Sequence, residues 1–301
     1  MRSGWGGNDT EMKLSVIVPC FNAAETIAVQ LEALAGQEWS EPWEIIISNN
    51  GSTDDTLAIV ERYRERLPNM RIVDASAEKG AAYAINVGAD AARGEAIAFC
   101  DADDEIAPGW IAAMGSALET HDFVASRFDY EKLNESWTQK RMWVVQEAGL
   151  QKTRFHPYMV HAGSCGLGIK RRLHEAVGGF DVTMPVLWDG DYCFKVQRLG
   201  TRLHFEPNAT VFVRYRNDLR SAFRQARQWA TYNPLLYKRY RTPEVEFPTP
   251  WRFYLMGWRT FLYKLRSARR KEDFAKCVWV LGWQIGLLQG SVKFWAPPVP
   301  I

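Results

Sequence analysis

Residues 96–105 read AIAFCDADDE, an apolar run that leads directly into four carboxylates. A run without polar side chains from Ala96 to Cys100 is typical of a strand buried on both faces, as in the middle of a parallel sheet. Carboxylates this close repel one another by about 1 kcal/mol per near pair unless a cation lies among them. A hard divalent ion held by carboxylates and phosphate oxygens relieves this repulsion, and a solvated acidic turn is the alternative.

Strands and helices alternate in the residues before this stretch. Short runs rich in β-branched residues read as strands over Leu14–Val18, Glu44–Ile47 and Arg71–Asp74, the first of them stopping at a proline. Helical patterns lie between these runs, and an Ala-rich helix over Ala81–Ala92 ends at Gly94. The alternation predicts an α/β layered fold whose ligand lies at the carboxyl ends of the strands.

The second half of the chain is less regular. Phe123–Phe128 and Leu203–Val213 read as strands, whereas Trp110–Leu118 and Asp191–Leu199 read as helices. A helix over Leu219–Tyr240 is followed by a break with three prolines and then by an aromatic and basic segment. We predict a flexible N-terminus over residues 1–12, one α/β domain over residues 13–217, and a helical basic-aromatic C-terminal appendage over residues 218–301.

Composition and charge bound the class of protein. With 301 residues, 47% of them hydrophobic, the chain can build a substantial core, which excludes disorder throughout. The net charge is +2, but the charges are unevenly placed: residues 1–213 contain 20 Lys and Arg and 30 Asp and Glu, so this part is acidic. Residues 214–272 reverse the balance, with 15 basic against 4 acidic residues.

Cysteine usage and hydropathy indicate the compartment. The five cysteines are scattered without a C-x-x-C pair, which indicates neither a zinc site nor a disulfide framework and favours a reducing compartment. Residues 1–10 lack the apolar run of a signal peptide. The longest apolar stretch, Cys277–Leu288, is interrupted by Gln284 and is shorter than the roughly 20 residues of a membrane span. We expect a cytoplasmic protein.

Several short motifs follow one another along the chain: Ser15–Asn22, Asn49–Asp54, Gly80 with Asn86, Phe99–Asp104, Gly178–Asp181 and Trp188–Asp191. Taken in this order, they resemble the motifs of the family 2 glycosyltransferases with the GT-A fold. Each motif is weak alone, but the ordered set covers about the first two-thirds of the chain. The resemblance implies a Rossmann-like mixed sheet flanked by helices, and transfer of a sugar from a nucleotide-diphosphate donor to a hydroxyl with inversion.

The resemblance also implies a donor site. The positions that match it are Pro19, Phe21, Asn22, Asn49, Asn50, Ser52, Gly80, Asn86, Asp101, Ala102, Asp103, Arg214 and Arg216. Asp101 and Asp103 match the D-x-D motif that binds Mn²⁺ or Mg²⁺ against the diphosphate, with Asp104 in a supporting role. The family usually has Asp where Asn49 and Asn50 stand; an Asn carbonyl still accepts a hydrogen bond from uracil, so a UDP-hexose is the favoured donor.

A second departure concerns the strand end near Val213. The family often has a metal-binding His there, whereas this chain has Arg214 and Arg216. An arginine does not ligate a cation, but it neutralises a diphosphate directly. Either the metal has fewer protein ligands or one of these arginines shares its work.

The resemblance places the general base at Asp189. A carboxylate within about 3 Å of the acceptor hydroxyl can take its proton. The family's usual Glu-Asp pair is Trp188-Asp189 here, so Asp191 is the fallback base, and an N-terminal helix cap is the alternative role for Asp191.

The segment Phe155–Gly168, with His156 and His161, is expected to shape the acceptor pocket. Its Ser164 and Cys165 invite a nucleophile hypothesis, but the residue before Gly163 is alanine, which does not match a G-x-S-x-G elbow. Trp188 is a candidate for stacking on a sugar ring, with core packing as the competing role.

Cations and aromatic residues interleave in the C-terminal segment. Arg220, Arg224 and Arg227 share one helix face, and cations alternate with rings from Trp251 to Lys271. This pattern favours peripheral attachment to an anionic membrane, at the inner face of the plasma membrane, with a lipid-linked or membrane-proximal acceptor as its corollary. We expect the acceptor to be a glycan, a lipid-linked molecule or a small molecule. A solvated helix face is the alternative, and nucleic-acid binding is disfavoured because no recognised module accompanies the charge.

Two other functions remain to be weighed. A nucleotidyltransferase would need a Gly-rich basic loop after the first strand, and residues 20–26 contain no Gly, Lys or Arg. A catalytically silent sugar-nucleotide-binding or membrane-associated scaffold with the same fold is the alternative from another class, and donor turnover distinguishes it from an enzyme.

Overall fold

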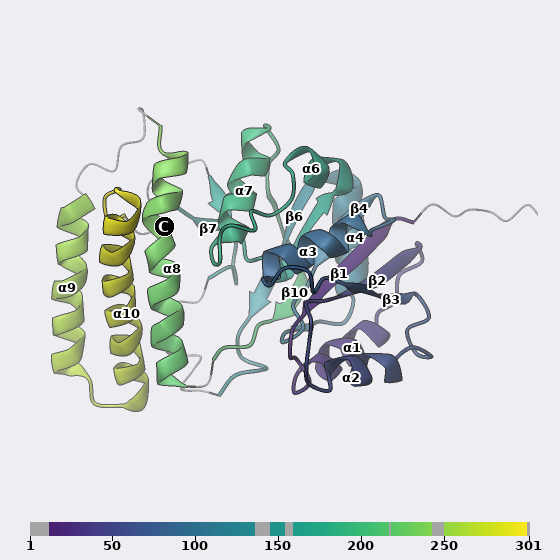
Figure 1. Ribbon diagram of the computed structural model, residues 1–301, viewed down its shortest axis with the longest axis horizontal. Helices are drawn as coiled ribbons and strands as arrows, with labels where there is room; N and C mark the ends of the chain where they lie inside the picture. Colours follow the sequence, from purple (N-terminus) through teal and green to yellow (C-terminus); the bar gives the residue numbers. More distant parts are fainter. Residues whose placement is uncertain (1–11, 136–144, 154–158, 217, 243–249, 300–301) are drawn as a thin grey trace, which may run out of the picture.

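A computed structural model describes residues 12–135, 145–153, 159–216, 218–242 and 250–299, and an eight-stranded mixed sheet forms its centre (Figure 1). The strands of this sheet are β1 (Leu14–Cys20), β2 (Trp43–Asn49), β3 (Met70–Asp74), β4 (Ala96–Phe99), β5 (Glu105–Ile106), β6 (Phe123–Asp129), β9 (Leu167–Lys170) and β10 (His204–Phe212). Their spatial order is β3-β2-β1-β4-β9-β6-β10-β5. Two further strands, β7 (Gln151–Lys152) and β8 (Val160–His161), form a separate antiparallel pair.

Helices cover both faces of the sheet. They are α1 (Ile27–Ala35), α2 (Thr56–Arg62), α3 (Ala81–Asp90), α4 (Trp110–Thr120), α6 (Arg171–Ala176) and α7 (Trp188–Arg198), with a short 3₁₀ turn η1 (Ser164–Gly166). Side chains alternate along each strand, so Val16 and Val18 of β1 pack under α1, α2 and α4, whereas Ile17 packs under α3 and α7. The predicted mixed sheet between helical layers is confirmed.

The parallel half of the sheet determines where a ligand can bind. β3, β2, β1 and β4 are mutually parallel, and the chain runs outward from β1 to β3 before it returns to β4 on the other side of β1. The strand order therefore reverses between β1 and β4. In open α/β sheets the crevice outside the carboxyl ends of the strands at such a reversal is the usual ligand site.

Strand β1 continues past the proline at which it was expected to stop. It pairs with β2 as far as Cys20, but its pairing with β4 ends at Ile17. The Ile17 carbonyl faces the β4 side, where it accepts from the Cys100 N–H, and Pro19 two residues later faces the same side. Because β1 no longer pairs with β4 at this point, the sheet loses no hydrogen bond through the absence of an N–H on Pro19.

The sequence predicts that the strand over Ala96–Cys100 lies in the middle of a parallel sheet, and strand β9 corrects this expectation. β4 is parallel to β1 but antiparallel to β9, and β9 is also antiparallel to β6. The strand contains Gly168, where an added Cβ would lie 2.5 Å from the Met114 Sδ of α4. Glycine is required there because helix α4 approaches the sheet closely.

Three long helices form the C-terminal region: α8 (Leu219–Tyr240), α9 (Pro250–Ser267) and α10 (Lys271–Phe294). In Figure 1 they stand side by side, with α10 between α8 and α9. The predicted helix over Leu219–Tyr240 is confirmed, and the Asp218 side chain caps it by accepting the Ser221 N–H at 2.7 Å.

Small residues let α8 and α10 approach closely. Ala222, Ala226 and Ala230 of α8 are fully buried against α10. An added Cβ at Gly286 of α10 would lie 2.3 Å from the Arg227 carbonyl oxygen of α8. The other end of α8 carries Tyr240 into the core beneath the sheet, so α8 belongs both to the helical layer and to the body.

Candidate active site

Four loops meet at the carboxyl edge of the parallel strands. They follow β1, β2, β3 and β4, and they carry most of the predicted donor-site residues. The first two loops are joined by polar contacts. The Asn22 N–H donates to Ser52 Oγ at 3.1 Å, and the Asn22 Oδ1 accepts the Thr53 N–H at 2.8 Å. Asn22 has a positive φ of 48°, a conformation that asparagine tolerates better than most residues.

Phe21 presents an open ring beside these joined loops. Its side chain is 50% exposed, and Lys79 Nζ lies 5.8 Å from the ring centroid. Pro19 is half-buried, and Asn49 is buried with its Oδ1 accepting the Ser52 N–H at 3.1 Å. The structure therefore places Pro19, Phe21, Asn22, Asn49 and Ser52 at the same edge of the sheet, and their role in binding the donor stays a prediction.

Asn50 has a different role from the predicted base contact. Its Nδ2 donates to the carbonyls of Ala75 and Glu78 at 2.5 and 2.7 Å, and its Oδ1 accepts the N–H of Gly80 at 2.9 Å. These three bonds use most of the hydrogen-bonding capacity of the amide. Asn50 thus positions the loop after β3, and Gly80, with φ 143°, begins α3 at the end of that loop.

Asn86 is also occupied within the protein. Its Nδ2 donates to the Phe180 carbonyl, and its Oδ1 accepts the Phe180 N–H, both at 2.9 Å. Gly179, at φ 67°, makes this possible, because an added Cβ would lie 2.6 Å from the Asn86 Oδ1. Asn86 thus holds the loop of residues 178–181 against α3.

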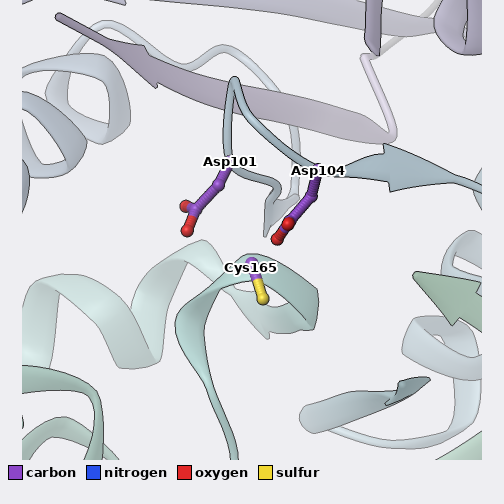
Figure 2. A group of neighbouring side chains, drawn as sticks. All are labelled: Asp101, Asp104 and Cys165. Carbon is purple, nitrogen blue, oxygen red and sulfur yellow. The ribbon is translucent and has the colours of Figure 1, made fainter. Parts of the chain in front are cut away.

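The acidic turn after β4 gathers carboxylates around one point. Ligand atoms of Asp101, Asp104 and Cys165 lie within 4.8 Å of one another, and Figure 2 shows the two carboxylates descending side by side toward the segment that carries Cys165. Burial, reinforced by the charges of neighbouring carboxylates, raises the pKa of both Asp101 and Asp104. Asp103, on the same turn, is one of these neighbours for both, and Ala102 is buried between them.

Asp104 is engaged by protein groups, unlike the two carboxylates of the predicted metal motif. It is 4% exposed, its Oδ1 accepts the Arg214 N–H at 2.8 Å, and the Cys165 thiol hydrogen-bonds to it. Asp101 and Asp103 are half-buried, and their carboxylates form no hydrogen bond or ion pair with any described residue. Open oxygens at the mouth of the turn suit a cation, whereas Asp104 holds the turn in place.

Arg214 holds the same turn from the other side. Its Nε donates to the Asp103 carbonyl oxygen at 2.9 Å. The guanidinium of Arg214, which stands at the position where the family often has a metal-binding histidine, thus lies at the acidic turn. Arg216 is exposed two residues later.

Asp189 lies at the N-terminal end of α7, opposite the acidic turn. Its Oδ1 accepts the Gly190 N–H at 2.8 Å, and the backbone of Ser164 donates to it as well. Burial nevertheless raises the pKa of Asp189 to about 6, and its charge is near enough to raise the pKa of Asp101. The preceding Leu187 is held at a positive φ of 58°, a strained conformation of the kind found at functional sites.

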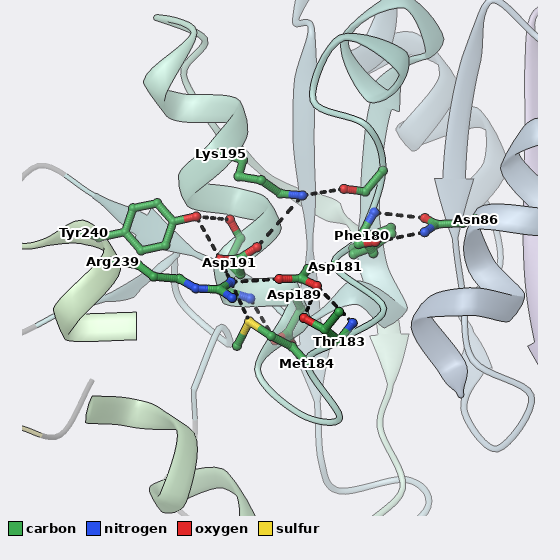
Figure 3. Close-up of polar contacts among 12 residues, drawn as sticks. Asn86, Phe180, Asp181, Thr183, Met184, Asp189, Asp191, Lys195, Arg239 and Tyr240 are labelled. Atoms are coloured by element: carbon green, nitrogen blue, oxygen red, sulfur yellow. Dashed lines mark hydrogen bonds and ion pairs between the residues drawn. The ribbon is translucent and has the colours of Figure 1, made fainter. Parts of the chain in front are cut away.

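Asp191 points away from this cluster. Its Oδ1 accepts from Arg239 Nη1 at 3.0 Å and from Tyr240 Oη at 2.9 Å, and both donors belong to α8 (Figure 3). The carboxylate is 2% exposed and its charge is satisfied by this network. Asp191 is not the helix cap, because α7 begins at Trp188 with Leu187 at the cap. The fallback role as base stays a prediction, and the Oδ1 atom of Asp191 is already occupied by Arg239 and Tyr240.

The remaining candidate site residues lie in different surroundings. His156 lies outside the described residues. Burial raises the pKa of the Cys165 thiol well above its ordinary value, so the thiol is protonated and is no nucleophile. Ser164 is buried and contributes its backbone to Asp189, and His161 lies in β8 with its pKa lowered to about 4 by burial. Trp188 packs edge-on against Phe180 at 5.2 Å between ring centroids, which favours its role in packing.

Two side-chain contacts at the site were not predicted from the sequence. Arg239 also bonds Asp181 at 2.8 Å, and Cys165 reaches Asp104 across the sheet edge. Arg239 stands in the basic C-terminal segment, for which the sequence favours membrane attachment, and Cys165 is one of five scattered cysteines. No local pattern distinguishes either residue, because each partner is far away in sequence.

Comparison with known proteins agrees with this geometry. The model of the family described as "Glycosyl transferase family 2" matches residues 15–177, slightly more than half of the chain. An uncharacterized glycosyltransferase of Escherichia coli, YibD, is 39% identical over 42% of this chain and 37% of its own length. The uncharacterized glycosyltransferase YwdF of Bacillus subtilis is 28% identical over 68% of this chain and 75% of its own.

Solved structures show the same fold. The mannosyltransferase PcManGT of Pyrobaculum calidifontis, solved with GDP-Man and Mn²⁺, superposes with a TM-score of 0.63 at 19% identity, over 93% of this chain and 86% of its own. Residues 1–349 of S. aureus TarS with UDP superpose with a TM-score of 0.55 at 19% identity, over 94% and 92%. The predicted GT-A fold is confirmed, and the chain belongs to glycosyl transferase family 2.

Proposed function

We propose that this chain is an inverting, metal-dependent hexosyltransferase that moves a sugar from a UDP-hexose to the hydroxyl of a glycan or lipid-linked acceptor. The observation that carries the proposal is the position of Asp189. Its carboxylate lies opposite the acidic turn of Asp101 and Asp103 and has a pKa raised to about 6 by burial. A base and an acidic turn that face each other at the sheet edge match the two ends of a glycosyl transfer.

The acidic turn fits a hard divalent ion. Asp101 and Asp103 are half-buried, and their carboxylate oxygens are engaged by no described residue, so they are available as ligands of a cation that would offset the repulsion among the carboxylates of the turn. Carboxylate oxygens are the ligands that hard divalent ions such as Mg²⁺ and Mn²⁺ prefer. When bound, Mn²⁺ or Mg²⁺ would neutralise the charge that develops on the departing diphosphate.

The protein groups then have distinct tasks. Asp189 accepts the proton of the acceptor hydroxyl, whose oxygen attacks the anomeric carbon as the bond to the diphosphate oxygen breaks. The guanidinium of Arg214, held at the turn by the Asp103 carbonyl, lies where it can share the charge of the diphosphate. Cys165 is not a nucleophile, which supports a single displacement and inversion.

The donor side of the site is assigned to the joined loops after β1 and β2. The exposed ring of Phe21 offers a face on which a base can stack, and Asn49 lies beside it. The neighbours were solved with UDP, with UDP-GlcNAc and with GDP-Man, which supports a nucleotide-sugar donor. Uridine is favoured because two of these neighbouring structures, both of TarS, were solved with uridine nucleotides.

A donor screen tests the proposal. UDP-, GDP- and dTDP-sugars are incubated with Mn²⁺ or Mg²⁺, and released nucleoside diphosphate is measured for wild type, Asp103→Ala and Asp189→Asn. Asp90→Asn, at the exposed end of α3, is the control. Metal-dependent release from a UDP-hexose that is lost in the first variant and reduced in the second is the expected result. Donor binding without turnover by wild type under any condition would instead support a silent sugar-nucleotide-binding scaffold.

A further inference from the structure

Helix α9 leaves large apolar side chains in solvent. It lies at the outer edge of the three-helix layer and packs mainly on α10 (Figure 1). Within the helix only Tyr254 is buried. Exposure reaches 53% for Trp251, 61% for Leu255 and 74% for Tyr263. An exposed apolar surface of this extent on one helix marks a contact surface.

The exposed residues form ordered rows along the helix. At 100° per residue, Trp251, Leu255 and Leu262 lie within about 40° of one another. Arg252, Arg259 and Arg266, spaced by seven, form a second row of about the same width beside the first. Met256 and Tyr263 continue on the far side of this arginine row. The outer face of α9 is therefore a basic row between two apolar ones.

The charge of this surface selects its partner. Residues 250–270 contain six Lys and Arg and no Asp or Glu. Arg252, Arg259 and Arg266 are exposed, and none of them forms an ion pair with a described residue. A second copy of α9 packed on this face would bring like charges together with no acidic residue to offset them. The complementary surface is apolar and anionic, which describes a bilayer of acidic phospholipids.

None of the helices in the described ranges combines the length and the hydropathy of a membrane span. A helix with apolar rows, an aromatic residue at its start and a row of arginines has the composition of one that lies in the plane of the interface. There, Trp and Tyr rings lie at the level of the headgroups, and arginines bind the lipid phosphates.

We propose that the outer face of α9, formed by Trp251, Leu255, Leu262 and the row Arg252, Arg259 and Arg266, docks on the headgroup layer of an anionic bilayer. Such docking would hold the protein near a membrane-proximal acceptor. The docking proposal itself rests on the exposure and charge of α9 and not on the transfer reaction. Docking through α9 leaves the carboxyl edge of the sheet, on the other side of α8, free of the contact.

Vesicle co-sedimentation of the full chain, without donor, tests the proposal. The probes are vesicles of phosphatidylglycerol with phosphatidylcholine, and vesicles of phosphatidylcholine alone. Wild type is expected to sediment with the first and not with the second. In the triple variant Arg252→Gln/Arg259→Gln/Arg266→Gln, affinity for the anionic vesicles is expected to fall roughly 100-fold, because each cation contributes about fivefold to the affinity. The charge-matched control is Arg62→Gln/Lys152→Gln/Arg202→Gln, three exposed cations of the body, and it should bind as wild type does.

The apolar row is tested by Trp251→Ser/Leu255→Ser/Leu262→Ser. Its affinity for the anionic vesicles is expected to fall more than about tenfold. Far-ultraviolet circular dichroism and the rate of donor hydrolysis in solution, both unchanged, show that each variant is folded and that the active site is intact. Failure of the transfer reaction would leave the vesicle result standing, so the two proposals are tested separately.

Two outcomes would overturn the docking proposal. One is that wild type and both α9 variants sediment equally with the anionic vesicles, or that none of the three sediments with them. The other is a wild-type dimer in light scattering without lipid that the serine variant abolishes, which would assign the surface to a second copy of the chain.

Discussion

The guanidinium of Arg239 lies 3.0 Å from Oδ1 of Asp191, and the same Nη1 atom lies 2.8 Å from Oδ2 of Asp181 (Figure 3). Asp191 belongs to the first turn of α7, two residues after Asp189, and Asp181 belongs to the loop that Asn86 holds through Phe180. One arginine of α8 thereby connects the C-terminal helices to both elements that position the proposed base.

Replacement of this arginine should weaken the fold and the reaction together. Arg239→Met leaves the buried Asp191 carboxylate with the Tyr240 hydroxyl at 2.9 Å and Lys195 Nζ at 3.9 Å, so the free energy of unfolding is expected to fall by about 1–3 kcal/mol. The turnover number should also fall, because α7 loses an anchor near Asp189. Urea unfolding and steady-state kinetics measure the two effects. Arg224→Met, an exposed arginine of the same helix, is the control, and equal losses in both variants would contradict the assigned role.

The pH dependence of turnover should report Asp189. A general base acts when ionised, and burial raises the pKa of this carboxyl to about 6, so turnover is lost as the pH falls through about 6. In Asp189→Asn, turnover is expected to fall by about 10²–10⁴-fold, and the residual activity should lose this acidic limb. Initial rates between pH 5 and 8 with a stable UDP-hexose check both points. A variant that keeps the wild-type profile would exclude Asp189 as the base.

Asp103 and Asp104 should differ in their effect on metal activation. Asp103→Asn removes an open ligand oxygen, so the Mn²⁺ concentration for half-maximal activity is expected to rise by about tenfold or more. Asp104→Asn keeps an oxygen that can accept the Arg214 N–H, so the same concentration should change by less than about threefold. Titration of donor hydrolysis with Mn²⁺ makes the comparison. A larger effect in the Asp104 variant would place Asp104 among the ligands.

The buried His174 should make stability depend on pH. It is 5% exposed, its Nδ1 lies 2.8 Å from the Tyr192 hydroxyl, and its pKa is lowered to about 4, mainly by burial. Between pH 6.5 and 4 the unfolded chain therefore binds a proton that the folded chain does not, and stability falls as the pH falls.

The loss from this group is about 2 kcal/mol between pH 7 and pH 5. In His174→Gln, which keeps an amide partner for Tyr192, the fall in unfolding free energy over this range should be smaller by that amount. Urea denaturation at the two pH values measures it. An unchanged difference between the two pH values would mean that His174 is already charged in the folded protein or has access to water.

Local sequence patterns were sufficient for the parallel half of the fold. β-Branched and apolar runs predict β1, β2, β3 and β4, and the capped pattern after Asp218 predicts α8 to the residue, because these elements depend on periodicity and propensity along the chain itself. The acidic turn was evident for the same reason, since its carboxylates adjoin one buried strand. Strand β9 was missed because it is four residues long, contains glycine and exists only by pairing with β4 and β6.

Tertiary structure alone decided how the polar groups are shared. Asn50 and Asn86 carry the motif of a donor site, yet their amides are used by backbone groups up to 94 residues away. The sequence favours Asp189 as the base and leaves Asp191 as the fallback, and in the structure α8 brings Arg239 and Tyr240 to Asp191 alone of the two. The amino-acid sequence determines which residues can act as acids, ligands and anchors through their chemistry and local periodicity. Which of them remain open to a substrate depends on long-range packing, because a hydrogen-bonding group already satisfied by a distant partner has no capacity left to bind anything else.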